Sequence, residues 1–98
     1  MNLADMQANA EQAAELLRAM ANKHRLLILC MLNSGELSVS QLNDELKIPQ
    51  STLSQHLSVL RKDGLVNTRR DAQTIYYSLR SPQVEELIST LYRLYCAK

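Results

Sequence analysis

The sequence predicts a mainly α-helical domain with one small β-hairpin, in the order helix, helix, helix, helix, strand, strand, helix (ααααββα). Three observations lead to this fold class. Apolar residues recur at spacings of three and four over most of the 98 residues, as on one face of a helix. Between residues 65 and 79 this spacing gives way to the β-branched and aromatic residues typical of strands. Phe and Trp are absent, so the core must be aliphatic, which favours helices.

The first half of the chain begins with two predicted helices. The first lies near residues 4–20 and is amphipathic, with apolar side chains at helical spacing: Leu3, Met6, Ala10, Ala13, Leu17 and Met20. The second covers about residues 23–33, "KHRLLILCMLN", and its middle is apolar all round. We therefore expect a buried central helix that stops near Gly35.

Two further helices are predicted around a tight turn. Ser38 with Gln41 fits a capping box that opens a short helix over "SVSQLNDEL". Pro49 then breaks the chain within "KIPQ". The next helix covers residues 50–62, ends at Gly64 in a left-handed cap, and has a core stripe of Leu53, Leu57 and Leu60.

A hairpin and a last helix complete the chain. Residues 65–70 and 74–79 are predicted strands joined by the turn "DAQ". Ser81 caps the last helix, Pro82 takes its first position, and its apolar stripe is Val84, Leu87, Ile88, Leu91, Leu94 and Tyr95. This order is that of a winged helix-turn-helix, here one domain over residues 1–98, a size that dimerisation would help to stabilise.

Charge is distributed unevenly along the chain. The net charge is +1, but residues 1–46 balance to −3 and residues 47–80 to +4. A basic segment that contains the helix over residues 50–62 and the hairpin, which forms the wing, suits nucleic acid, although an ordinary solvated face would look the same.

Polar residues gather at the start of the helix over residues 50–62. In a recognition helix these positions meet base edges and phosphates, because Gln can pair with adenine, and Ser or Thr can donate or accept at several bases. A helix N-terminus also favours phosphate. Alternatively, Ser51 is merely a helix cap and the others are simply solvated: Thr52, Ser54, Gln55 and His56.

Three segments resemble the ArsR/SmtB family of bacterial winged-helix regulators. They are "LLRAMANKHRLLILCML" (16–32), "STLSQHLSVLRKDGLV" (51–66) and "RRDAQTIYYSL" (69–79), and they occur in the family's order over almost the whole chain. Within the family, the chain looks most like the HlyU-type branch, which lacks metal ligands. The resemblance implies a homodimer held by the first and last helices and bound to an imperfect inverted repeat of DNA. It also implies a virulence role, switching on a haemolysin or other toxin gene by displacing a silencing protein.

The family's DNA-contacting residues carry over to specific positions of this chain. The helix would supply base and phosphate contacts, and two wing arginines would lie near the minor groove or flanking phosphates. The expected set is Gln50, Ser51, Thr52, Ser54, Gln55, His56, Arg69 and Arg70. Gln73 departs from the usual Gly-Arg wing tip, which leaves the depth of wing contact open.

Metal sensing, found in many family members, is not expected here. The family's Cys-x-Cys site is occupied by Ser38 and Ser40, and hydroxyls cannot replace thiolates for soft metals. The last helix has Glu85 and Glu86 but no histidine, and the two histidines of the chain have no neighbour at ligand spacing. A metal-responsive repressor remains only an alternative.

Cys30 and Cys96 have two interpretations. Cys30 would be a small buried hydrophobe and Cys96 an incidental thiol. The resemblance implies instead a redox-sensing pair, because the family's thiol-based sensors of persulfides and oxidants carry cysteines at these two places. A bridge needs Cα atoms within about 7 Å. It would tilt the last helix and change the spacing of the two recognition helices, which must match about 34 Å of DNA.

Other classes of function have little support. An enzyme is not expected, because Cys30 sits in an apolar run and the chain has only two glycines and no phosphate-binding loop. No cofactor is implied. A winged helix that binds only protein is the other alternative, and weak salt dependence would reveal it. The start of the chain predicts no signal peptide, and no apolar run is long enough for a membrane span. We therefore expect a cytoplasmic location with reduced cysteines.

Overall fold

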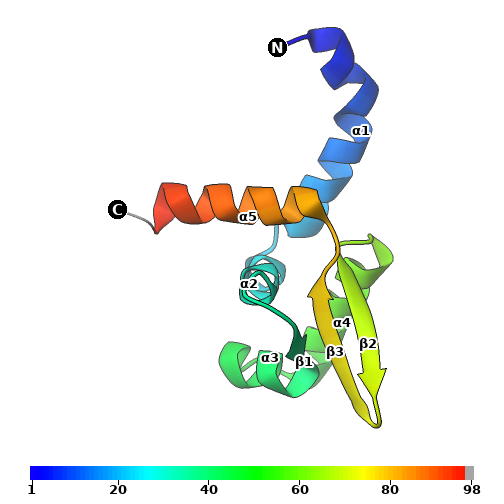
Figure 1. Ribbon diagram of the computed structural model, residues 1–98, viewed down its shortest axis with the longest axis vertical. Coiled ribbons are helices and arrows are strands. Elements are labelled where there is room, and N and C mark those ends of the chain that lie inside the picture. Colours follow the sequence, from blue (N-terminus) through cyan, green and yellow to red (C-terminus); the bar gives the residue numbers. More distant parts are fainter. Residues whose placement is uncertain (97–98) are drawn as a thin grey trace.

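The computed structural model describes residues 1–96 and confirms the expected order of helices and hairpin, with one additional strand (Figure 1). Helices α2, α3 and α4 form the body, the sheet lies beside them, and α5 crosses α2, while α1 extends away from the rest. The elements are α1 (Leu3–Met20), α2 (Lys23–Leu32), β1 (Leu37–Ser38), α3 (Val39–Leu46), α4 (Gln50–Lys62), β2 (Val66–Asp71), β3 (Thr74–Leu79) and α5 (Pro82–Tyr95).

The sheet has three antiparallel strands in the order β1-β3-β2. Strand β1 was not predicted, because two residues are too few to show a period of two. Asp71 pairs with Thr74, so the hairpin turn is Ala72–Gln73 and not the predicted "DAQ". Ala72 has φ +56°, which follows the usual need of two-residue hairpin loops for a left-handed residue.

The core is aliphatic, as predicted, and lies between α2, α4, the sheet and the start of α5. Helix α4 buries all three leucines of its predicted stripe, and Gly64 adopts φ +77° after it. The expectation that α2 is buried all round is wrong. Only Ile28, Leu29 and Leu32 are buried, whereas Leu27 and Cys30 are exposed, because α5 crosses α2 and covers only part of it (Figure 1).

The outer parts of α1 and α5 leave apolar side chains uncovered. In α1 only Ala19 and Met20 are buried, so most of its predicted apolar stripe has nothing to pack against within one chain. The exposed large side chains of the two helices are Leu3, Met6, Leu17, Tyr92, Leu94 and Tyr95. Apolar surface of this extent is typical of an interaction surface. Within the described residues, no helix is long and apolar enough to cross a membrane.

Candidate nucleic-acid interface

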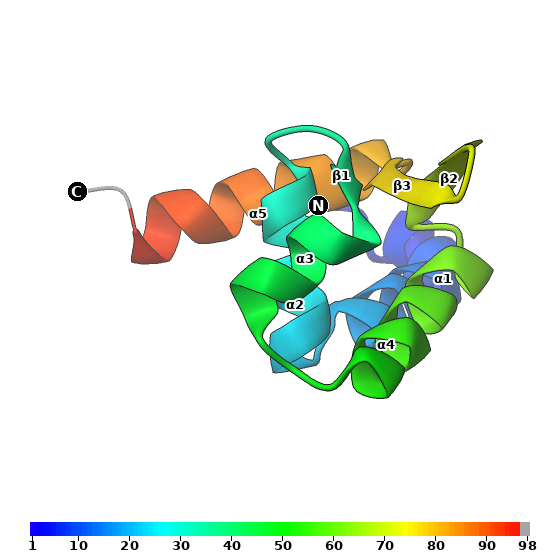
Figure 2. The ribbon, with the colours of Figure 1, turned by 90° about the horizontal axis from the view of Figure 1, so that it is seen from below.

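Helix α4 presents an exposed polar face beside the wing. Seen from below, a short loop leads from α3 to α4, and the hairpin lies beside one end of α4 (Figure 2). The leucines point into the core, whereas Ser51, Ser54 and Gln55 are exposed and Thr52 is half-buried. The predicted polar group therefore lies on the outside, except for one member described below.

The start of α4 lacks a side-chain cap. Its N-cap residue is Pro49, no side chain bonds the first turn, and the capping box around Ser38 and Gln41 belongs to α3, as predicted. The interpretation of Ser51 as a cap is therefore wrong, because the helix already begins at Gln50. First-turn N–H groups have no partner within their own helix, so those of α4 are available to a phosphate.

A groove of ≈ 550 Å³ separates α4 from the tip of the wing. Gln50 and Ser54 line it, as does the wing-tip residue Gln73. Sequence reasoning missed Ser58 and Arg61, which follow Ser54 at spacings of four and seven and complete the α4 side of the groove. That spacing, which places all three on one helical face, was the signal that could have found them.

His56 is turned toward α2 and not toward the outer face. Its ring centroid lies 5.6 Å from that of His24, and the Arg25 guanidinium donates to its Nδ1 over 3.5 Å. Arg25 also donates from Nε to the carbonyl of Ala19 over 2.7 Å, which ties the end of α1 to α2 and α4. Burial, then the charges of Arg25 and His24, lower the pKa of His56. His56 is thus neutral near pH 7, and its contacts with α2 hold its side chain in place.

The two histidines do not form a metal site with other residues. His24 and His56 are adjacent, but no group of three His, Cys, Asp or Glu side chains suited to a metal occurs within residues 1–96. A structural zinc ion takes four ligands and a catalytic one three, so this pair alone falls short.

The two predicted wing arginines have different surroundings. Arg69 is held by Glu36, with Nε donating to Oε2 over 3.1 Å and a terminal nitrogen to Oε1 over 2.7 Å. Its guanidinium carbon also lies 4.5 Å from the centre of the Tyr76 ring. The hydrogen bond from Arg69 lowers the pKa of Glu36, so the pair stays charged at neutral pH. Arg70 is exposed at the next position of β2.

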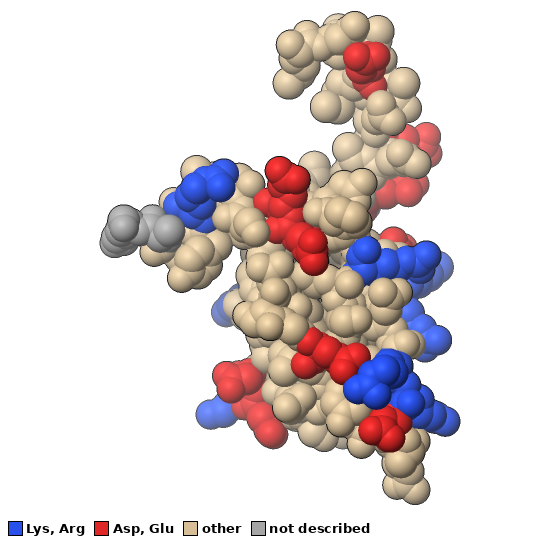
Figure 3. Space-filling view, in the orientation of Figure 1, with Lys and Arg blue, Asp and Glu red and all other residues tan. Residues whose placement is uncertain are grey.

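Basic side chains gather on one edge of the face drawn in Figure 3. Lys and Arg side chains lie along the edge formed by the hairpin, whereas Asp and Glu side chains are spread over α1, α5 and α3, with some of them beside the basic side chains of the hairpin. The basic edge adjoins the groove beside α4 and suits a polyanion. The predicted basic balance of residues 47–80 therefore becomes a basic surface in three dimensions.

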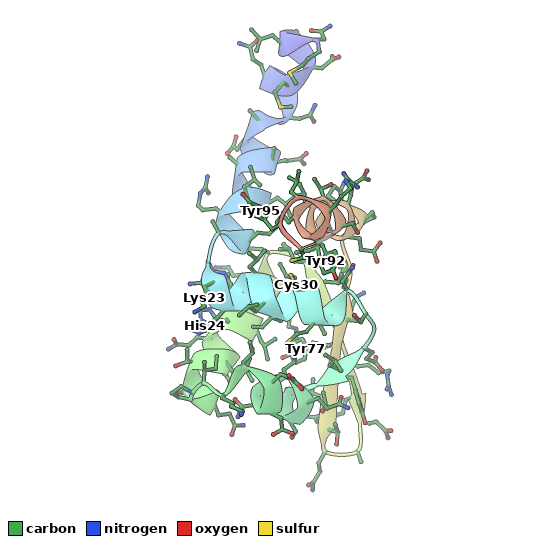
Figure 4. All side chains as sticks on the ribbon, turned by 90° about the vertical axis from the view of Figure 1, so that its left-hand side faces the viewer. Lys23, His24, Cys30, Tyr77, Tyr92 and Tyr95 are labelled. Atoms are coloured by element: carbon green, nitrogen blue, oxygen red, sulfur yellow. The ribbon has the colours of Figure 1, made fainter. Side chains whose placement is uncertain are left out.

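Cys30 lies in α2, and Cys96 follows the last residue of α5, the helix that crosses α2. Both are exposed, and Figure 4 shows Cys30 beneath α5 close to Tyr92. Burial, then the charge of Cys96, raises the pKa of Cys30. The interpretation of Cys30 as a buried hydrophobe is wrong, because its side chain is exposed although it lies beneath α5.

A helix-turn-helix with an exposed polar recognition helix, a flanking wing and a basic edge defines the class of winged-helix DNA-binding proteins. Residues 22–68 match the family described as "Bacterial regulatory protein, arsR family". The chain is 56% identical to the transcriptional activator HlyU of Vibrio cholerae over 96 residues, which cover 98% of this chain and 89% of that protein. The chain belongs to the ArsR family, as its resemblance predicted, and is a DNA-binding transcription regulator.

Solved structures agree with this assignment. Reduced HlyU from Vibrio cholerae superposes with a TM-score of 0.90 at 55% identity, covering 94% of this chain and 97% of that one. The transcriptional repressor BigR from Xylella fastidiosa superposes with a TM-score of 0.94 at 40% identity, covering both chains completely. These structures confirm the winged-helix fold. The family consists of transcription regulators, which are not enzymes.

Proposed function

We propose that the chain acts as a homodimer, held by its first and last helices, on an inverted repeat of double-stranded DNA. The observation that supports dimerisation is the uncovered apolar surface of α1 and α5, which a second copy could bury. Two recognition helices related by a twofold axis would then meet successive major grooves about 34 Å apart. Residues 1–98 form one domain that carries both DNA binding and dimerisation.

Within each half-site, α4 reads bases and the wing binds the backbone. Gln50, Ser51, Thr52, Ser54 and Gln55 face outward and make the direct contacts, joined by Ser58 and Arg61 of the groove. His56, Arg69 and Arg70 complete the set. His56 acts from its contact with α2, and Arg69 acts from within its pair with Glu36. Gln55→Ala should relax preference at particular bases, whereas Arg70→Ala should weaken binding to all sequences alike.

DNA binding is switched by oxidation of Cys30 and Cys96 to an intramolecular disulfide. Both thiols are exposed, so peroxide can reach either one. Reaction of one thiol with peroxide forms a sulfenic acid and releases water, and the other thiol then displaces a second water to form the S–S bond. With a persulfide donor, one thiol takes up the outer sulfur and releases the donor thiol. The other thiol then attacks the inner sulfur of this protein persulfide, which forms the same disulfide and releases hydrogen sulfide. The bridge would pull the end of α5 toward α2 and change the dimer.

The biological role follows the HlyU-type relatives. The chain acts in the cytoplasm as an activator or derepressor of virulence genes such as a haemolysin or toxin. The name of the Vibrio cholerae relative, transcriptional activator HlyU, supports the activating role. Another relative, 40% identical, is named a biofilm growth-associated repressor. The direction of regulation is therefore set by where the operator lies and not by the fold.

The test is a DNA-binding titration by fluorescence anisotropy, with an inverted repeat selected from random sequence. Reduced protein should bind tightly, and protein treated with peroxide or persulfide should bind weakly. Cys30→Ser and Cys96→Ser should each bind well and ignore both reagents, and a single half-site is the control for dimeric binding. Equal binding by reduced and treated wild-type protein would refute the switch. Failure to select any sequence would refute the DNA-reading assignment itself.

A further inference from the structure

The contact between Glu36 and Arg69 joins two segments that are 33 positions apart. Glu36 immediately precedes β1, and Arg69 lies in the middle of β2 opposite Tyr76. The carboxylate takes one edge of the guanidinium in a two-point contact, while the tyrosine ring covers a face. Such paired geometry fixes the orientation of the arginine far better than a single contact would.

The position of the pair matters more than its stability. The Arg69 side chain is 53% exposed and that of Glu36 35% exposed, so the bridge is open to solvent and contributes little to folding. A basic side chain on a DNA-binding wing normally contributes its charge to phosphate neutralisation. Here a carboxylate already neutralises that charge before any DNA arrives.

We propose that Glu36 is a built-in competitor that withholds Arg69 from phosphate and so lowers the affinity of the wing for DNA. Arg69 and Glu36 enter the complex as a neutral unit, leaving Arg70 as the wing residue that carries net positive charge to the backbone. Glu36 thus limits nonspecific binding, because the affinity that arises from phosphate contacts is independent of sequence. This inference rests on the proposed placement of the wing against DNA.

The salt dependence of binding measures this masking directly. Each additional phosphate that a protein neutralises steepens the plot of log K against log salt by about 0.9. Glu36→Gln retains an oxygen that can accept from Arg69 but removes the competing charge. We expect a slope steeper by about 0.9 per wing, or about 1.8 for the dimer with its two wings. On going from ~1 M to ~0.1 M salt, the affinity of the variant should therefore rise about eightfold more per wing than that of the wild type, or about 60-fold more for the dimer.

Two further variants separate charge masking from other effects. Glu86→Gln makes the same change in net charge on α5, far from the wing, and should leave the slope unchanged. Arg69→Ala added to Glu36→Gln should return the slope to the wild-type value, because the unmasked charge is removed. A purely structural role of the bridge predicts instead that Glu36→Gln weakens binding and leaves the slope unchanged.

The outcomes distinguish this inference from the proposed function. If Arg70→Ala weakens binding but Glu36→Gln does not steepen the slope, masking is wrong and the wing still binds DNA. If neither Arg70→Ala nor Glu36→Gln changes binding, the placement of the wing against DNA is wrong. If Glu86→Gln steepens the slope as much as Glu36→Gln, the effect belongs to net charge, and masking is again wrong.

Discussion

Arg25 is the side chain that joins α1, α2 and α4, and its removal should destabilise the fold. Its guanidinium donates to the carbonyl of Ala19 over 2.7 Å, to that of Arg18 over 3.4 Å, and to Nδ1 of His56 over 3.5 Å. Ala19 is only 3% exposed, so the carbonyl at the end of α1 has little access to water if the arginine is lost. Arg25→Met keeps an unbranched apolar side chain and removes every donor.

The expected cost comes mainly from the shortest of these contacts. A hydrogen bond from a charged donor contributes about 1.5–3 kcal/mol, and the two longer contacts add little, so the free energy of unfolding should fall by about 2 kcal/mol. For a domain of this length, that loss corresponds to a decrease in Tm of about 8–15 °C.

The assay is thermal unfolding followed by far-UV circular dichroism at one fixed protein concentration, since association makes Tm depend on concentration. Arg18→Met is the matched control, because the Arg18 side chain makes no hydrogen bond to any described residue, and its Tm should stay within about 2 °C of the wild type. If Arg25→Met has the same Tm as the Arg18→Met control, the contact to Ala19 does not hold α1 against the body.

Three other predictions address separate features. The pKa of His56 is lowered in the folded chain from its ordinary value of 6.5, so the unfolded chain takes up the proton first as pH falls. The free energy of unfolding should therefore be highest above pH 6.5 and should fall as pH drops toward the folded pKa. In urea titrations at several pH values, His56→Gln should reduce this loss of stability. Lys47 caps the C-terminus of α3 with φ 53°, so Lys47→Gly should raise the free energy of unfolding by about 0.5–1 kcal/mol. Lys62→Gly in α4, where the backbone is helical, should lower it by about 1 kcal/mol. Thermal unfolding measures both changes. If the disulfide weakens DNA binding by some factor, operator DNA must stabilise the dithiol form by the same factor. In a glutathione titration, operator DNA should therefore raise the midpoint potential of the thiol pair by about 30 mV for each tenfold difference in DNA affinity between the two forms. An unchanged midpoint would assign the lost binding to a different oxidation product.

The elements that sequence predicted well are those whose signals are local. The apolar spacing of α4, the capping box at Ser38 and the glycine after α4 each depend on residues within a few positions of one another. The change to β-branched and aromatic residues likewise identified both long strands within one or two residues. Only β1 escaped, because its two residues gain their strand character from pairing with Tyr76 and Tyr77.

The features that sequence could not supply depend on contacts between distant segments. The position of His56 on α4 suggested an outward side chain, but Arg25, 31 positions earlier, holds it against α2. Arg69 similarly looked like a free wing cation until Glu36 was found beside it. Cys30 sits in an apolar run that suggests burial, and only the crossing of α5 shows which strip of α2 stays open.

Helix α2, which has ten residues, lies between the proposed thiol pair on one side and the recognition helix α4 on the other. One side carries Cys30 toward α5 and Cys96, while the other buries Ile28 and Leu29 in the core shared with α4. Its first turn also holds Arg25, which contacts α4 through His56. A bridge that draws α5 toward α2 thus acts on the helix against which α4 is packed, as well as on the dimer. Such contacts alone do not show energetic coupling. Coupling requires that α2 and its neighbours have two arrangements, and that both the cysteines and bound DNA shift the balance between them. If α2 carries the signal within one subunit, oxidation should weaken binding to a single half-site, and if only the dimer carries it, the half-site should be bound equally well in both states.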